Sequence, residues 1–281
     1  MSGKISVSLL SALVLLAACG LGANAQTFGS YTPYSIFGVG DLASPGTAYN
    51  KSMGGVGIAS RNHRFLNPLN PAAVTARDTL AFMADYSIIQ DNKIFRQGDM
   101  RSASNTANIG DLLISFPIWK SSAMMVGIMP FSSTGYDYSY SFTDPSLIGR
   151  TGNITYDANG QGSMYQLFAS FGATFWRRFS VGAEGIFFFG KNEKTFTETF
   201  EDASYNGASN GHLLQLSAPA FKVGLQYEQP LGTKASLTIG ATYRSAATIG
   251  GNVESYRFAA SDTLYYKSGA PVGVKLASEK G

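Results

Sequence analysis

The feature that most constrains the fold is a strict alternation of apolar side chains over residues 163–191. Only Arg177 and Arg178 separate its two arms. Period-two alternation over about ten residues per arm indicates two antiparallel strands joined by a tight turn, each long enough to cross a bilayer on a tilt. The alternating positions are Tyr165, Leu167, Ala169, Phe171, Ala173 and Phe175 on the first arm, and Phe179, Val181, Ala183, Gly185, Phe187 and Phe189 on the second.

The same strand unit recurs along the chain. Alternating stretches occupy residues 78–88, 110–118, 123–131, 212–227 and 236–243, and a further strand begins at residues 271–277. With the two arms above, this gives about eight strands. Within 212–227 the apolar positions change phase by one near Pro219, which predicts a β-bulge there.

The connections between these strands alternate between short and long. Short turns are expected at 120–122, 177–178 and 229–234, whereas long polar segments occupy 90–108, 132–162, 192–211 and 245–270. Transmembrane barrels have short turns at one rim and long loops at the other, and a soluble sandwich lacks this alternation. We therefore predict an all-β fold, a transmembrane antiparallel β-barrel over residues 78–281.

Composition agrees with a barrel and excludes other classes. Only 14% of residues are charged, against roughly a quarter in soluble proteins. No apolar run after the first segment is long enough for a membrane-spanning helix. The net charge of +3 is small and unclustered, so we expect no nucleic-acid partner.

The N-terminal 25 residues are typical of a secretory signal peptide. Lys4 supplies the positive charge, an apolar stretch follows, and Ala23-Asn24-Ala25 is a small-residue cleavage site. The alternative is lipoprotein cleavage before Cys19, because Leu16-Ala17-Ala18-Cys19 resembles a lipobox. We favour cleavage after Ala25, which leaves the mature chain without cysteine. This places the protein in the outer membrane of a Gram-negative bacterium.

Residues 26–77 are rich in Gly, Pro, Asn and Ser and have no sustained period. A structureless segment of this length is too long for an ordinary loop. It is either a disordered leader or a compact piece inside something larger.

Two motifs in this segment resemble the FadL-type family, outer-membrane transporters of long-chain fatty acids and other hydrophobic compounds. One is the Gly-rich stretch 53–59 and the other is the Asn-Pro-Ala step before the first strand. The resemblance implies that residues 26–77 form a hatch in a fourteen-stranded barrel, with capture at the outer loops and sideways exit beside a kinked strand. With about eight strands and a polar chain end, either the barrel closes at eight strands with an unusual end or the chain is a C-terminally truncated member, and we favour truncation. The hatch residues are Gly54, Gly55, Gly57, Asn70, Pro71 and Ala72.

Candidate residues for a substrate path lie on strand 123–131, which is apolar on both faces. A water-filled porin would need a polar lumen there. Methionine suits an adaptable lipid pocket, but plain packing against the hatch explains the same residues and is the simpler interpretation. The candidates are Met124, Met125, Met129 and Phe131.

Glu184 is a further candidate, because it is a carboxylate on the inward face of an apolar strand. Its burial would be costly without a partner, and Lys222 or Arg244 would supply one. The alternative is that these charges face water in the lumen, which we favour. Tyr136, Tyr138 and Tyr140 alternate and either extend a strand above the membrane or form a landing surface for substrate.

The leading hypothesis is passive uptake of hydrophobic small molecules by a monomer in contact with outer-membrane lipid, without enzyme chemistry, cofactor or metal. His63 and His212 have no ligand-type neighbours at metal spacing and no identifiable nucleophile partner. The alternative is a non-transporting barrel that acts as a scaffold or a component of a secretion machine. A diffusion porin is a third hypothesis.

Overall fold

The computed structural model describes residues 29–77, 81–202, 204–232, 235–259 and 274–280. The predicted signal peptide and Cys19 lie outside this range. In the described part, short helices precede or interrupt the strands: η1 Pro33–Ile36, α2 Ala48–Ser52, η2 Pro71–Thr75 and α3 Pro145–Ile148. The strands are β1 Asp41–Leu42, β2 Met83–Gln97, β3 Met100–Trp119, β4 Ser122–Phe142, β5 Ile154–Phe175, β6 Phe179–Phe200, β7 Ala208–Pro230, β8 Ser236–Arg244, β9 Gly250–Ala259 and β10 Val274–Lys280.

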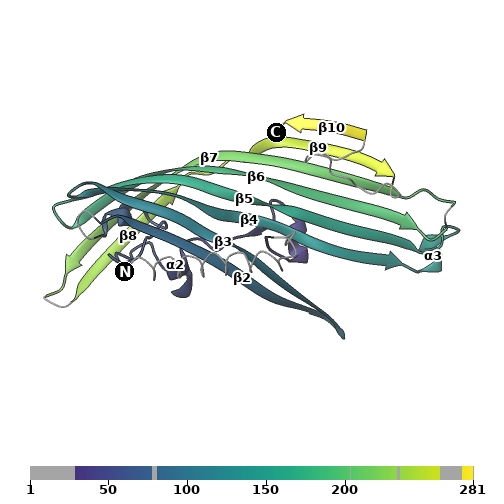
Figure 1. Cartoon of the computed structure of the whole chain (residues 1–281), viewed down its shortest axis with the longest axis horizontal. Coiled ribbons are helices and arrows are strands. Elements are labelled where there is room, and N and C mark those ends of the chain that lie inside the picture. The colour runs from purple at the N-terminus through teal and green to yellow at the C-terminus, as the bar shows by residue number, and fades with distance from the viewer. Residues whose placement is uncertain (1–28, 78–80, 203, 233–234, 260–273, 281) are drawn as a thin grey trace, which may run out of the picture.

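These strands form one curled antiparallel sheet, a half-barrel (Figure 1). Neighbours in the sheet follow the order β10-β9-β7-β6-β5-β4-β3-β2. One half of β7 pairs with β8 and the other half with β9. The predicted all-β antiparallel architecture is thus confirmed, although the described sheet has ten strands rather than about eight.

The hairpin predicted from the alternation is the centre of the sheet. β5 and β6 pair without a register shift from Phe175↔Phe179 to Ile154↔Phe200. The turn is one residue longer than predicted, because it contains Trp176 as well as the two arginines. Trp176 and Arg177 adopt positive φ angles of 48° and 60°, a left-handed conformation that closes the short turn.

The predicted long polar loops are wrong for most of their length, because they are strand. β2 and β3 continue through 90–108 and are connected only by residues 98–99. β4 extends to Phe142 and β6 to Phe200, and β9 lies inside the predicted loop 245–270. The half of the sheet toward α3, which we call the far half, carries polar residues on both faces. The alternating Tyr136, Tyr138 and Tyr140 correctly indicated the extension of β4. The other extensions lack an apolar period that would reveal a strand in sequence.

The predicted bulge at Pro219 is also absent from the pairing of β6 with β7. The register runs evenly through Phe187↔Pro219. Leu216 and Ala218 lie on the same face as buried Phe188, whereas Phe221 and Leu225 lie on the opposite, exposed face. The apolar residues therefore change face along one regular strand, which mimics a phase slip in the sequence. Register shifts do occur next to two other prolines, Pro117 and Pro130.

Residues 29–77, which we call the inner segment, pack on one face of the sheet, the inner face. β3 pairs with β4 only as far as Leu112↔Ile128. In the part of the sheet that leads to α3, the β2–β3 hairpin separates from β4 (Figure 1). There the inner segment pairs with the edge of β4 that β3 leaves free. β1 pairs with it, and the Ala43 amide donates to the Phe131 carbonyl over 2.9 Å.

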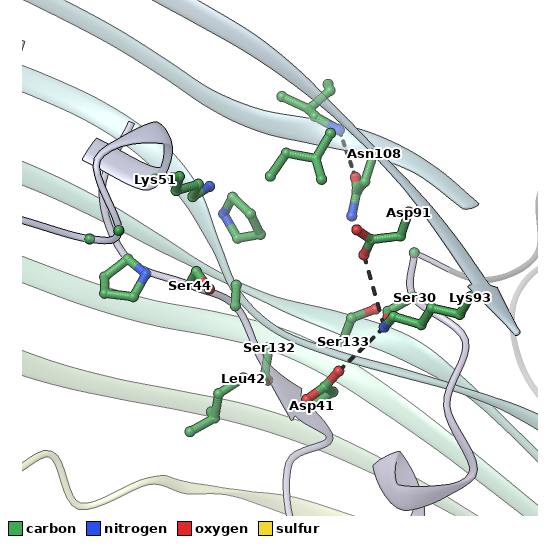
Figure 2. Close-up of a pocket in the computed structure, with 18 residues that line it drawn as sticks. Ser30, Asp41, Leu42, Ser44, Lys51, Asp91, Lys93, Asn108, Ser132 and Ser133 are labelled. Atoms are coloured by element: carbon green, nitrogen blue, oxygen red, sulfur yellow. Dashed lines mark hydrogen bonds and ion pairs between the residues drawn. The ribbon is translucent and has the colours of Figure 1, made fainter. Parts of the chain in front are cut away.

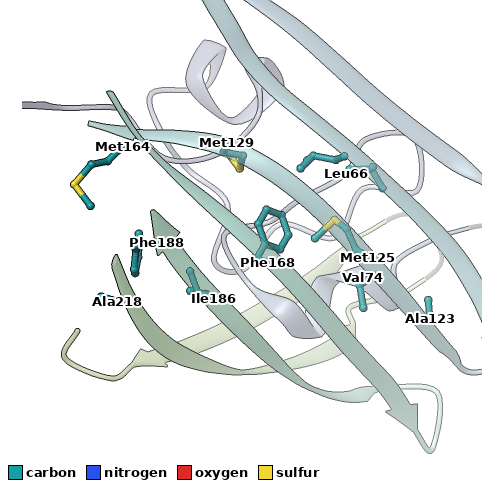
Figure 3. Packing of buried hydrophobic residues seen from close by; sticks show 11 residues of the cluster. Leu66, Val74, Ala123, Met125, Met129, Met164, Phe168, Ile186, Phe188 and Ala218 are labelled. Carbon is teal, nitrogen blue, oxygen red and sulfur yellow. The ribbon is translucent and has the colours of Figure 1, made fainter. Parts of the chain in front are cut away.

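The apolar core lies between the inner segment and the sheet (Figure 3). Leu66 and Val74 of the inner segment join apolar side chains from β3 to β7. Opposite-face positions of the same strands, such as Leu167 at 50% exposure, stay outside this core. The strand members are Leu113, Ala123, Met125, Met129, Met164, Phe168, Ile186, Phe188 and Ala218.

Candidate functional site

The most elaborate polar site of the described chain is the contact between the inner segment and one half of β5 to β7. This is the half nearest to the β5–β6 turn, and we call it the turn-proximal half. Arg61 lies at its centre and donates to Ser180 Oγ over 2.8 Å and to Gln226 Oε1 over 3.0 Å. Its Nε lies 3.5 Å from a carboxylate oxygen of Glu228. Burial lowers the pKa of Arg61, and Glu228 acts in the opposite direction. The guanidinium thus joins the segment to two neighbouring strands.

A chain of hydroxyl groups continues from this arginine. Thr174 Oγ1 donates to Thr75 Oγ1 over 2.7 Å and lies 2.8 Å from Ser180 Oγ. Ser180 and Gln226 are almost completely buried. Because buried polar groups are costly unless hydrogen-bonded, these partners fix one position of the segment on the sheet.

Asn70 fixes the backbone of the segment against β7. Its Oδ1 accepts from the Ala72 amide and caps η2, while its Nδ2 donates to Ile58 O over 2.8 Å and to Leu225 O over 3.1 Å. The side chain is fully buried. The side-chain amide of Asn70 therefore caps the first turn of η2 and links the backbone at Ile58 to that of β7.

Glycines on the sheet permit this close approach. A Cβ at Gly224 would lie 2.0 Å from Asn70 Oδ1, and one at Gly182 would lie 2.3 Å from the Pro71 carbonyl carbon. Gly185, which lies on the opposite face, has no atom within 4 Å of such a Cβ. The inner face of β6 and β7 is therefore shaped for the Asn70–Ala72 turn.

Glu184 and Lys222 form a second polar contact at the same interface. Lys222 Nζ lies 2.7 Å from Glu184 Oε1 and donates to Pro68 O, also over 2.7 Å. Ser170 Oγ donates to Glu184 Oε2 over 2.5 Å. The favoured expectation that Glu184 faces lumenal water is wrong, because the residue is only 4% exposed. Its partner is Lys222 rather than Arg244, which is exposed on β8.

The other end of the inner segment is held through its backbone. Lys194 Nζ donates to Ile36 O over 2.6 Å and to Gly38 O over 3.0 Å. Asn192 Nδ2 and Ser132 Oγ both donate to Val39 O. The segment is thus tied at both ends to the same sheet.

A cavity of about 690 Å³ lies between these ends (Figure 2). At one side Lys93 lies 3.7 Å from Asp41 and 3.9 Å from Asp91. At the other side burial lowers the pKa of Lys51, while Asp111 and Asp91 act in the opposite direction. Its lining comes from the inner segment and from β2 to β4: Gly29, Ser30, Asp41, Leu42, Ala43, Ser44, Pro45, Lys51, Gly54, Gly55, Ile89, Asp91, Lys93, Asn108, Ile109, Pro130, Ser132 and Ser133.

The predicted path residues do not gather at this cavity. Met125 and Met129 are buried in the core beneath the inner segment, and Phe131 packs on Phe188 with ring centroids 4.6 Å apart. Met124 lies on the opposite face, where it pairs with Phe171. The geometry favours the simpler interpretation, packing against the inner segment.

The predicted hatch residues separate into two groups. Asn70, Pro71 and Ala72 are buried at the contact with the sheet. Gly57 is buried beside them, and a Cβ there would lie 2.4 Å from Leu69 Cδ1 and 2.8 Å from Asn50 Nδ2, so a larger residue would displace both side chains. Gly54 and Gly55 line the cavity with positive φ angles of 73° and 82°.

Sequence reasoning missed Arg61 and Gln226. An arginine in a Gly-rich stretch without period carries no signal for its partners. A weak signal existed in the strands, because Ser180 and Gln226 are polar at positions that alternate with apolar residues. They become recognisable only when the inner face is known to be covered.

Within the described ranges, no group of three or more His, Cys, Asp or Glu side chains could hold a metal ion. Across the same part of the chain, no helix combines the length and the apolar character needed to cross a membrane. His212 Nδ1 lies 3.0 Å from Ser255 Oγ, which gives the histidine a structural partner on β9.

Comparison with known proteins gives one match. The model of a protein family described as BamG matches residues 5–267. No curated protein matches the chain, and no solved structure does. The FadL-type resemblance is therefore wrong, because the match covers almost the whole chain and is to a different family.

Proposed function

We propose that this chain, which belongs to the BamG family, is a component of the machinery that assembles proteins in the bacterial outer membrane. The family match over residues 5–267 carries this proposal. It corrects the leading hypothesis from the sequence, uptake of hydrophobic small molecules, and with it the lipid-transport role. It agrees with the alternative of a barrel that serves a secretion machine.

We further propose that the turn-proximal half of the sheet lies in the outer membrane. The outer face there carries a band of exposed apolar side chains. The band covers about ten residues of each strand, which is the length that a tilted membrane-spanning strand requires. Beyond Tyr165 and Phe189 the same face becomes polar, with Asp157, Lys191 and Glu193. The band consists of Leu112, Ile114, Phe116, Ile118, Leu167, Phe171, Phe175, Phe187, Phe221, Val223, Leu225, Tyr227, Leu237, Ile239 and Tyr243.

In this proposal residues 26–77 act as a fixed hatch rather than a mobile gate. The Arg61 cluster, Asn70 and the Glu184–Lys222 pair support this, because displacing the segment would leave buried polar groups without partners. The protein then acts as a rigid structural subunit that contacts outer-membrane lipid, without enzyme chemistry, cofactor or metal.

Depletion of the chain in its source bacterium tests the function. The level of folded, heat-modifiable barrel proteins in the outer membrane is measured by gel shift and quantitative proteomics. We expect many unrelated barrel proteins to fall together, while inner-membrane proteins stay constant. Unchanged barrel proteins together with a selective loss of fatty-acid uptake would contradict the proposal.

Complementation supplies a matched control. A Gly224→Leu variant removes the space for Asn70, whereas Gly185→Leu places the same side chain on the opposite, open face. We expect only Gly185→Leu to restore barrel-protein levels. If both variants restored barrel-protein levels equally, the function would not depend on a fixed inner segment.

A further inference from the structure

The far half of the sheet carries a group of exposed aromatic rings on its inner face. Tyr140 is 58% exposed, Tyr156 40% and Tyr138 39%. The inner segment contacts β4 as far as Asp137, whose carbonyl accepts from the Tyr31 hydroxyl. The rings lie beyond that contact. We call Tyr138, Tyr140, Phe142 and Tyr156 the aromatic shelf.

The aromatic shelf is held together by contacts between neighbouring strands. Tyr140 pairs with Tyr156 across β4 and β5, and Tyr156 pairs with Glu198 across β5 and β6. Phe142 makes edge-to-face contacts with both tyrosines, at centroid distances of 4.7 and 5.5 Å. The Tyr156 hydroxyl donates to Glu198 Oε1 over 2.8 Å. Held in place by neighbours, these rings lose little entropy when a partner binds.

Buried Tyr136 supports the base of the shelf. Its ring lies over Gly160, where a Cβ would come within 2.2 Å of the ring. Tyr138 lies against it at a centroid distance of 5.8 Å. The aromatic surface therefore continues from the protein interior to the exposed rings.

The surrounding chain is strongly acidic. Asp137 and Asp157 point to the outer face. The other charged residues of 136–160 and 195–211 are Asp144, Glu198, Glu201, Asp202 and Arg150, a net charge of −3 in a chain whose total is +3. The carboxylate of Glu198 lies on the shelf beside Tyr156. Asp144, Glu201 and Asp202 lie in the connections at the ends of the same strands.

We propose that the aromatic shelf docks a basic polypeptide segment of a partner protein. Tyrosine rings attract Lys and Arg side chains through cation–π contacts, and the carboxylates add charge complementarity. Tyrosine is also enriched at the centres of protein interfaces. An anionic lipid surface does not fit as the occupant, because the local charge of −3 repels it.

This inference does not depend on the assembly function, since it rests only on the far half of the sheet. The test uses the purified full chain in detergent micelles and a fluorescent octa-arginine peptide, with octa-glutamate as the opposite-charge probe. Binding is followed by anisotropy. We expect octa-arginine to bind at low salt and octa-glutamate not to bind.

Neighbouring residues of β4 provide matched variants, because Tyr140 and Ser139 point to opposite faces. Tyr140→Leu combined with Tyr156→Leu should weaken octa-arginine binding by about tenfold. Ser139→Leu should leave it unchanged, and Tyr140→Phe should retain it because the ring remains. Glu198→Gln should weaken binding, whereas Asp157→Asn on the outer face should not.

Equal octa-arginine affinity in the Tyr140→Leu/Tyr156→Leu and Ser139→Leu variants would overturn the proposal. So would equal binding of octa-glutamate. If light scattering showed that the wild-type chain self-associates and that Tyr140→Leu abolishes this, the occupant would be a second copy and the proposal would also fail. Far-UV circular dichroism and the guanidinium unfolding midpoint of each variant confirm that it is folded before binding is measured.

Discussion

Replacing Lys222 by methionine would leave the Glu184 carboxylate buried without its ammonium partner. Lys222 also donates to Pro68 O, so the change removes one tie to the inner segment as well. Glu184 keeps only the hydrogen bond from Ser170. Breaking a buried ion pair from one side costs about 3–5 kcal/mol in the free energy of unfolding, most of it from the uncompensated charge.

The double variant Glu184→Gln/Lys222→Met should recover most of this loss. Its glutamine amide is neutral and can still accept from Ser170, so no charge remains buried. We expect the double variant to lie within about 1–2 kcal/mol of the wild type. The non-additivity is the signature of the buried pair.

Guanidinium unfolding of the purified chain in micelles measures these differences, with fluorescence of Trp119 and Trp176 as the probe. Arg244→Met is the matched control, because Arg244 pairs in register with Lys222 but is exposed. Its change should stay within about 0.5 kcal/mol. If Lys222→Met costs no more than Arg244→Met, or if the double variant is as unstable as Lys222→Met, the argument for a buried pair is refuted.

Three further predictions concern packing and membrane contact. Gly224→Ala should destabilise the chain by about 1–3 kcal/mol through overpacking against Asn70, whereas Gly185→Ala should be neutral, as guanidinium midpoints would show. Asn70→Ala should cost about 1–3 kcal/mol by removing the η2 cap and leaving buried carbonyls unpaired, and hydrogen exchange of the Ala72 amide should rise. Leu225→Arg should make the free energy of folding into lipid vesicles less favourable by about 2–4 kcal/mol, whereas Thr197→Arg outside the band should not. Equal effects of the two changes would contradict the proposal that the band lies in the membrane.

The sequence predicted the strands wherever one face is apolar. The hairpin around Arg177 and Arg178 was correct to within one residue, because alternation over residues 163–191 leaves one register possible. The far half of β5 was wrongly predicted to be a loop, since Asp157, Asn159 and Gln161 are as polar as loop residues. The predicted bulge at Pro219 was wrong for another reason. The local pattern shows which face of a strand is apolar, but it does not show which face points inward.

The polar site was only partly accessible from sequence. Glu184 was singled out because a carboxylate interrupts an apolar face, and Lys222 was one of two candidate partners. Arg61 and Gln226 lie 165 residues apart, and no periodicity connects them. Their contact depends on how the inner segment folds back on β6 and β7, which is a property of the tertiary structure.

A pulse–chase measurement of barrel assembly tests the central claim most directly. Cells depleted of the chain are labelled briefly, and the rate at which a newly made outer-membrane barrel protein becomes heat-modifiable is followed. Because the assay observes the first minutes after synthesis, it precedes secondary effects on the envelope. The account predicts slower conversion, restored by the wild-type chain. Conversion at the normal rate in depleted cells would contradict a role in outer-membrane protein assembly.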